Sequence, residues 1–116
     1  MMTYNRGDVV LVLFPNSDLR TAKRRPGLVV QADSLGTGLS QTIVVMITSN
    51  MARAGHPSRI TVLLSTPEGQ QTGLLTDSVI MTDNIVTVEE TEIDRKIGVW
   101  SNMEAVDAGL QNTFGL

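Results

Sequence analysis

The 116-residue sequence contains no cysteine and only one histidine, His56. Without cysteine, the protein can have no disulfide framework, no thiolate nucleophile and no Cys-ligated metal site. A single histidine is too few for metal sites that need several imidazole ligands. We therefore expect neither metal catalysis nor Cys–His chemistry.

Aromatic residues and long apolar runs are also scarce. The four aromatic residues are too few for an extended base-stacking platform. The longest purely apolar run, Val9 to Phe14, is six residues, whereas a membrane-spanning helix needs about 20. No signal-peptide pattern is present at the N-terminus. These features predict a cytoplasmic protein with no membrane partner.

The charge is distributed unevenly over a chain whose length fits one domain, residues 1–116. The net charge is −3, which by itself argues against a nucleic-acid partner. However, residues 1–59 hold seven basic and three acidic groups, a local charge of +4. Residues 60–116 hold two basic and nine acidic groups, a local charge of −7. The acidic average therefore conceals an electropositive N-terminal half.

Short β-branched apolar runs, separated by turn residues and without helical spacing, predict an antiparallel β-structure. The expected strands cover residues 8–14, 28–30, 42–48, 59–65, 78–81 and 85–88. Residues 15–26 are expected to form a loop, because Pro15 ends the first run and Pro26 precedes the second. The predicted fold class is mainly β, a small curved barrel or sandwich of five to seven strands.

Helical spacing is clear only at the C-terminus. Ser101 and Glu104 form a possible capping box, and apolar residues follow at spacings of three and four, ending at Phe114. We expect Phe114 in the core and Trp100 packed against the start of this helix. A weaker helical turn is expected over residues 91–96.

The densest functional signal is a run of cations, Arg20, Lys23, Arg24 and Arg25, within six residues. One interpretation is a solvated loop kept soluble by its charge. The other is a phosphate site, because adjacent cations repel one another less beside an anion. The position of Arg25 directly before Pro26 holds its backbone extended, which would fix the origin of the guanidinium.

A second candidate is Thr48-Ser49-Asn50, at the end of the expected third strand. Such residues often simply terminate strands. If strand three runs back beside strand two, however, Thr48 lies close to Arg25. A hydroxyl donor and a guanidinium that converge on one point can bind a phosphate oxygen.

Two further polar groups have open interpretations. His56 could act as a general acid or base, although a solvated loop histidine is the more ordinary reading. Asp83 and Asn84 interrupt an otherwise apolar stretch. They could form a bulge or a turn, or direct a carboxylate into a site.

The sequence resembles the MazF/PemK toxins of bacterial toxin–antitoxin systems over nearly its whole length. The resemblance lies in ordered segments at similar spacing: 7–12 (GDVVLV), 14–15 (FP), 24–30 (RRPGLVV), 47–49 (ITS), 73–74 (GL), 77–79 (DSV), 87–88 (TV) and 97–98 (IG). It implies an SH3-like barrel, a homodimer and a MazE-like antitoxin partner with an acidic flexible tail. It also implies a metal-independent endoribonuclease without a cofactor that cuts single-stranded RNA.

The same resemblance implies roles for individual residues. Arg25 and Thr48 match the catalytic arginine and threonine, and Ser49 matches a position that contacts RNA. Asp83 matches the acidic residue of a later segment, [DE]-Q-x-R, and is a candidate proton acceptor. Asn84 and Val86 replace the glutamine and arginine of that segment. In addition, Arg20 stands where some members carry a glutamate, so the proton acceptor is the least defined role.

These expectations define one reaction and leave two alternative functions. Without metal ligands or cysteine, cleavage would use the RNA 2′-hydroxyl as nucleophile and give a 2′,3′-cyclic phosphate and a 5′-hydroxyl. The residues expected to bind RNA beside the catalytic ones are Arg20, Lys23, Arg24, Ser49 and Asn50. The alternatives are a CcdB-like non-enzymatic toxin that binds DNA gyrase and a catalytically inactive RNA-binding barrel.

Overall fold

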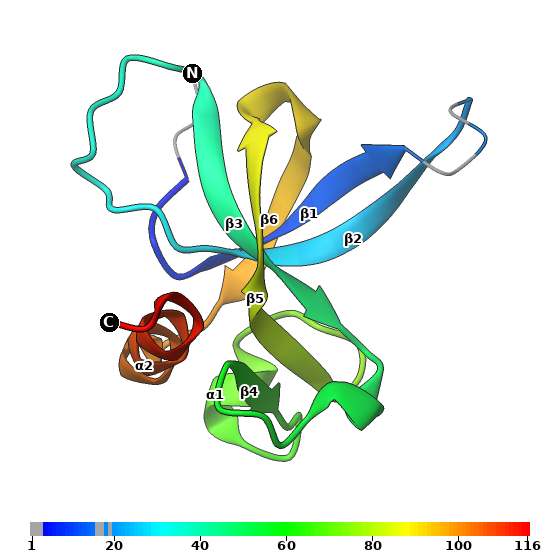
Figure 1. Ribbon diagram of the computed structural model, residues 1–116. Helices are drawn as coiled ribbons and strands as arrows, with labels where there is room; N and C mark the ends of the chain where they lie inside the picture. Colours follow the sequence, from blue (N-terminus) through cyan, green and yellow to red (C-terminus); the bar gives the residue numbers. More distant parts are fainter. Residues whose placement is uncertain (1–3, 16–17, 19) are drawn as a thin grey trace.

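The computed structural model describes the chain except residues 1–3, 16–17 and 19 (Figure 1). Its elements in order are β1 (Asp8–Pro15), β2 (Ala22–Val29), β3 (Gln41–Thr48), the 3-10 turn η1 (Met51–Arg53), β4 (Arg59–Val62), α1 (Pro67–Gln70), β5 (Ser78–Glu89), the 3-10 turn η2 (Glu90–Glu92), β6 (Ile93–Val99) and α2 (Met103–Phe114). The fold is mainly β with a C-terminal helix, as the sequence predicted.

The six strands form one antiparallel sheet in the order β4-β5-β3-β2-β1-β6. The sheet curls strongly but does not close (Figure 1). Neighbouring residues of a strand point to opposite faces, and here both faces are buried. Val10 and Val44 belong to one apolar cluster, whereas Val9 and Val45 belong to the other. This explains why the strands are continuous apolar runs rather than alternating patterns.

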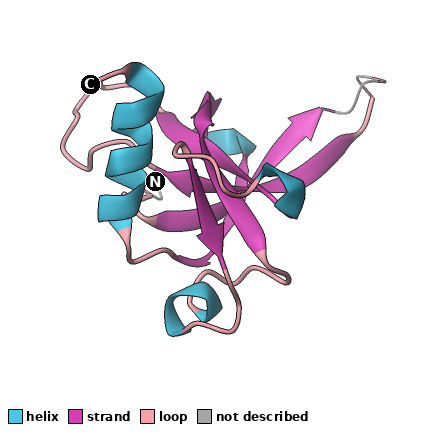
Figure 2. Cartoon of the chain, turned by 60° about the horizontal axis from the view of Figure 1, so that its bottom comes forward, coloured by secondary structure: helices cyan, strands magenta, loops and turns pink. Residues whose placement is uncertain are grey.

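The helix α2 covers the second of these clusters. Val106 is fully buried there beside Trp100, and the helix lies alongside the sheet at the opposite end from the β1–β2 hairpin (Figure 2). Trp100 therefore packs at the start of the helix as expected, and its indole Nε1 donates to the carbonyl of Asn102 over 3.0 Å. Within the described ranges, none of the helices has the length and apolar character needed to cross a bilayer.

Two details of α2 differ from the prediction. The N-cap is Asn102 rather than Ser101, because the Asn102 side chain accepts the hydrogen bond from the Ala105 backbone nitrogen at 3.3 Å. Phe114 is 60% exposed rather than buried. It is the last residue of the helix, where the chain turns away at Gly115 in a left-handed conformation.

The prediction of a loop over residues 15–26 is wrong for its second half. β2 begins at Ala22 and pairs with β1 from the Pro15↔Ala22 pair onward, whereas its pairing with β3 is confined to Gly27–Val29. Residues 22–26 thus have one paired neighbour only, and proline is tolerated in strands under that condition. The cations of this segment are therefore carried on a strand.

The helical turn expected over residues 91–96 is also wrong for most of its length. Only η2 is helical, and Ile93–Val99 forms the edge strand β6. Its exposed residues Asp94 to Lys96 give it no apolar alternation, because an edge strand with one neighbour can be held by backbone hydrogen bonds. A β-bulge does occur at Asp83-Asn84. Met46 pairs with Met81 but Val45 pairs with Ile85, so β5 has extra residues between them.

Candidate functional site

The cations of β2 lie at the end of the sheet where β2 and β3 separate. The last β2–β3 pair in this direction is Gly27↔Met46. The same antiparallel register, continued by two residues, places Arg25 opposite Thr48. Lys23, Arg24 and Arg25 are exposed here, so their guanidinium and ammonium groups face solvent rather than the core.

Arg25 and Thr48 line the same two hollows, and we refer to them as the Arg25–Thr48 pair. With Ile47, the two residues are shared by both linings and so mark the boundary between the hollows. A ligand that occupies both hollows would meet a guanidinium and a hydroxyl there.

The first hollow, which we call the cationic hollow, has a volume of about 380 Å³. It is lined by Leu11, Lys23, Arg24, Arg25, Pro26, Ile47, Thr48, Ser49, Gly73, Leu74, Leu75, Thr76, Ser78, Arg95 and Ile97. Every charged residue of this lining is a cation, and the remainder is largely apolar or carries hydroxyl groups. The arrangement suits an anionic ligand that also has flat apolar groups.

The second hollow, which we call the methionine hollow, has a volume of about 430 Å³. It is lined by Phe14, Arg25, Met46, Ile47, Thr48, Arg53, Met81, Asn84 and Val86. Its charged residues are two arginines. The phenyl ring and the two polarisable methionine side chains give it an adaptable apolar wall.

The Thr48 hydroxyl is oriented by the start of η1. Its Oγ1 accepts a hydrogen bond from the backbone nitrogen of Asn50 at 3.1 Å. The Asn50 side chain in turn accepts from the backbone nitrogen of Ala52 at 3.1 Å and caps η1. Since a hydroxyl has one hydrogen to donate besides its acceptor lone pairs, Thr48 can still donate to a ligand oxygen.

Arg24 and Arg95 reach the cationic hollow from β2 and β6. Arg24 Nε lies 3.1 Å and Arg95 Nη1 lies 3.4 Å from the same oxygen, Asp94 Oδ2. One carboxylate thus holds two guanidinium groups at the rim of the hollow. Because both arginine side chains are more than half exposed, these ion pairs contribute little to stability.

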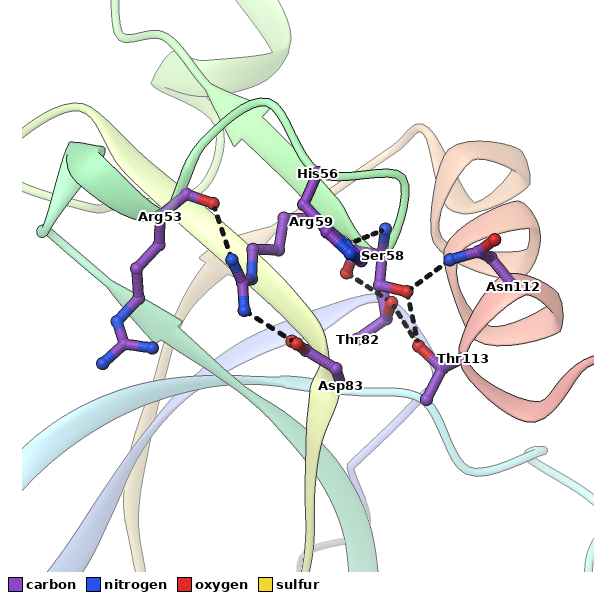
Figure 3. Close-up of polar contacts among 8 residues, drawn as sticks. All are labelled: Arg53, His56, Ser58, Arg59, Thr82, Asp83, Asn112 and Thr113. Carbon is purple, nitrogen blue, oxygen red and sulfur yellow. Dashed lines mark hydrogen bonds and ion pairs between the residues drawn. The ribbon is translucent and has the colours of Figure 1, made fainter.

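Asp83 is engaged by a different residue. Its Oδ2 accepts a hydrogen bond from Arg59 Nη2 at 2.9 Å (Figure 3). Asp83 does not line either hollow, although its neighbour Asn84 lines the methionine hollow. His56 is exposed, and its Nδ1 accepts from the Ser58 backbone nitrogen at 3.0 Å. The His56 side chain therefore stabilises its own loop, as the more ordinary interpretation expects.

Arg20 lies near the tip of the β1–β2 hairpin, outside the linings of both hollows. The backbone nitrogens of Arg20 and Thr21 donate to Asp18 Oδ1 at 2.9 and 3.1 Å. These hydrogen bonds favour the charged carboxylate and lower the pKa of Asp18. The carboxylate therefore holds the described part of this turn.

The structure brings together five of the eight predicted site residues: Lys23, Arg24, Arg25, Thr48 and Ser49. Arg20, Asn50 and Asp83 lie outside the linings of the two hollows. Two lining cations were missed by the sequence analysis, Arg53 and Arg95. Neither stands in a motif, so only the fold brings them beside Arg25.

Taken together, fold and site define a small mainly β domain that presents a cationic, partly apolar surface suited to a polyanion. Over residues 5–114 the chain matches the family described as the PemK-like, MazF-like toxin of type II toxin–antitoxin systems. It is also 36% identical over 107 residues to endoribonuclease MazF2 of Mycobacterium bovis and to endoribonuclease MazF6 of Mycobacterium tuberculosis. Each alignment covers 90% of this chain and 90% of the relative. The chain belongs to the PemK/MazF toxin family.

Solved structures support the same fold. The Mycobacterium tuberculosis toxin MazF-mt6 superimposes with a TM-score of 0.73 at 22% identity, covering 94% of this chain and 97% of that one. A chain of a MazE–MazF crystal structure from Deinococcus radiodurans gives a TM-score of 0.74 at 17% identity, covering 99% of each chain. At these identities the likeness concerns the fold, and the activity must be argued from the site.

Proposed function

We propose that this protein is the toxin of a type II toxin–antitoxin pair and a metal-independent endoribonuclease that cleaves single-stranded RNA at the Arg25–Thr48 pair. The observation that carries the proposal is the position of this pair at the boundary of two hollows whose charged residues are all cations. RNA presents phosphates and flat bases in alternation, which this lining fits. The family relatives that are 36% identical are named endoribonucleases.

The proposed reaction uses the substrate's own 2′-hydroxyl. The 2′-oxygen forms a bond to phosphorus while the bond from phosphorus to the 5′-oxygen breaks, which leaves a 2′,3′-cyclic phosphate and a 5′-hydroxyl. The 2′-hydroxyl loses a proton, and the leaving 5′-oxygen gains one. Since no acidic residue among those that the structure describes lines either hollow, the linings offer no carboxylate ligand for a divalent cation.

Arg25 would stabilise the negative charge that develops on the phosphorane oxygens, because its planar fork can donate two hydrogen bonds to them. The Arg25 guanidinium can also protonate the leaving oxygen. Thr48 would donate to a second phosphate oxygen from a hydroxyl that Asn50 already orients. The Thr48 hydroxyl is thus oriented before the substrate binds, which is the condition under which such groups accelerate a reaction most.

Asp83 is the proposed proton acceptor. Its Oδ2 is bound to Arg59, so Oδ1 would receive the proton. Because Asp83 does not line either hollow, the proton would reach it through a bridging water. Lys23 and Arg24 would bind flanking phosphates and Ser49 would contact the RNA, while Arg20 and Asn50 would act from the periphery of the site.

The cationic hollow also fits the antitoxin that this family implies. An acidic flexible segment would satisfy the same cations, and its apolar side chains would lie on Leu74, Leu75 and Ile97. A mycobacterial endoribonuclease of similar fold has been solved with its cognate antitoxin. We further propose a homodimer and a cytoplasmic location, where the RNA substrate is found.

Incubation of the purified protein with a panel of single-stranded RNAs, followed by mapping of the new 5′ ends, tests this function. We expect cleavage at a short recurring sequence by the wild-type protein and none by Arg25→Gln. A gyrase supercoiling assay in parallel distinguishes the non-enzymatic toxin: inhibition of gyrase with intact RNA would overturn the proposal. Binding of RNA without cleavage would show an inactive RNA-binding barrel instead.

A further inference from the structure

The methionine hollow contains an arginine that the sequence motifs do not assign, Arg53. The same hollow is lined by Val86, which stands where the resemblance expects an arginine. We propose that Arg53 binds the RNA phosphate next to the scissile one, and that it takes from η1 the place of the arginine missing at Val86. This inference rests on the proposed function and adds a substrate-binding residue to it.

The backbone of Arg53 is held in place by a chain of contacts from β5. Asp83 accepts a hydrogen bond from Arg59 Nη2 at 2.9 Å, and Arg59 Nη1 donates to the backbone carbonyl of Arg53 at 3.4 Å. At its other end, η1 is capped by the Asn50 side chain. The end of this short turn is therefore linked through Arg59 to β5, and its start is linked to β3, because the Asn50 backbone nitrogen donates to Thr48 Oγ1.

The Arg53 guanidinium itself points away from these contacts. In Figure 3 its head lies apart from the Arg59–Asp83 ion pair, and only its backbone carbonyl takes part in that network. Among the described residues, no carboxylate lies within ion-pair distance of Arg53, whereas Arg24 and Arg59 each have one. An exposed guanidinium without a carboxylate partner can bind a phosphate without breaking a contact.

The position of Arg53 selects one side of the scissile phosphate. Arg25 lines both hollows, whereas Arg53 lines only the methionine hollow. A nucleotide in that hollow would place its base against Phe14, Met46 and Met81, and its phosphate between Arg25 and Arg53. The volume of about 430 Å³ lies within the range of ligand pockets, about 300 to 1,000 Å³.

The test uses an RNA oligonucleotide that contains a mapped cleavage site and a 2′-deoxy nucleotide at the scissile position, so that it binds without being cut. We expect Arg53→Gln to weaken binding by about tenfold or more, the loss typical of one charge-assisted hydrogen bond. The slope of log affinity against log salt should fall by about 0.7, the value for one phosphate contact to single-stranded nucleic acid. Arg53→Lys retains the charge and should retain the slope.

A second substitution tests whether positions 53 and 86 serve one phosphate. The double variant Arg53→Gln with Val86→Arg should recover most of the lost affinity and the full salt slope. Lys96→Gln is the control for loss of one positive charge elsewhere, because Lys96 lies outside both hollows and its ammonium pairs with Asp8 at 3.1 Å. It should change neither the slope nor the affinity by more than a small factor. Thermal unfolding of each variant checks that the fold is intact, because Val86 is half-buried against the core and Lys96 pairs with the buried Asp8.

The outcomes separate the two proposals. If the wild-type protein cuts no RNA, the proposed function fails. If the wild type cuts RNA but Arg53→Gln binds the uncleavable oligonucleotide with unchanged affinity and slope, the role of Arg53 is overturned while the proposed function stands. If Val86→Arg does not rescue Arg53→Gln, the claim that the two positions bind one phosphate is wrong.

Discussion

Arg25 on β2 and Thr48 on β3 both line the cationic hollow and the methionine hollow, two residues beyond the last pair of the two strands. The separation of the strands at this point leaves their side chains facing a common space. The antiparallel register decides which residues meet there, so the site depends on strand pairing rather than on proximity in sequence. A shift of β3 by one residue would turn Thr48 to the other face of the sheet.

The hydroxyl of Thr48 should contribute more to the cleavage rate than the volume of the side chain does. Thr48→Val retains the volume but removes the donor, and we expect the cleavage rate to fall by about 10² to 10³, the usual cost of one oriented donor. Thr48→Ser should retain most of the activity. Single-turnover rates at saturating protein measure this. Equal rates for the valine and serine variants would show that the hydroxyl has no part in the reaction.

Arg25 should not be replaceable by another cation. Arg25→Lys retains the positive charge but loses the two-pronged fork, so we expect RNA binding to persist while the cleavage rate falls by at least about 10². Since Arg25 is exposed, its substitution should change the free energy of unfolding by no more than about 0.5 kcal/mol. A lysine variant that cleaves like the wild type would contradict a role in charge stabilisation.

The ion pair between Asp83 and Arg59 allows the proton-accepting role to be tested. General base catalysis contributes a factor of about 10² to 10⁴, so Asp83→Asn should lower the cleavage rate by that much. Arg59→Gln breaks the same ion pair but leaves the carboxylate, and its loss should be smaller. Equal losses in both variants and in their combination would show that Asp83 acts only through Arg59.

Gly109 lets α2 lie close to β5. A Cβ added there would lie 2.7 Å from Thr82 Oγ1, and Thr82 is held by its own donation to the Ser58 carbonyl at 2.6 Å. Overpacking costs about 1 to 3 kcal/mol, which exceeds the helix-propensity gain of up to about 1 kcal/mol. Gly109→Ala should therefore unfold at lower urea concentration.

The matched control for this substitution is Ala108→Ser, at an exposed position of the same helix. It should change the unfolding midpoint little. If Gly109→Ala were as stable as the wild type, the close packing of α2 on Thr82 would not restrict this position.

The cationic hollow should also bind an acidic peptide in competition with RNA. A flexible peptide of Glu, Asp and Leu should inhibit cleavage, and its neutral analogue with Gln and Asn should not, because the hollow offers four cations. Inhibition should weaken as the salt concentration rises and in Arg24→Gln. Inhibition that is insensitive to both changes would place the peptide elsewhere.

The strands and the C-terminal helix could be predicted from the sequence because their burial leaves a direct pattern. Both faces of the sheet are covered, so β1 and β3 are continuous apolar runs. An apolar pattern does not mark residues 22–26 or β6 as strands. Their backbones pair with a single neighbouring strand, and their charged side chains are exposed. Composition cannot distinguish such an edge from a loop or a helical turn.

The site could be predicted only as far as its residues lie together in the sequence or in a family motif. Lys23, Arg24 and Arg25 form a visible run, and Thr48 ends a visible strand. Arg53 and Arg95 stand in no motif, and they reach the two hollows because η1 follows the end of β3 and because β6 pairs with β1. The ion pair that holds Asp83 is likewise a long-range contact that no local pattern indicates.

The most direct test of the account is cleavage of a mapped RNA oligonucleotide in the presence of EDTA, beside the same oligonucleotide with one 2′-deoxy nucleotide at the scissile position. The account predicts that the all-RNA strand is cut to a 2′,3′-cyclic phosphate and a 5′-hydroxyl, while the substituted strand stays intact. Cleavage of the 2′-deoxy strand, or loss of all cleavage in EDTA, would contradict a metal-independent reaction through the RNA hydroxyl at Arg25 and Thr48.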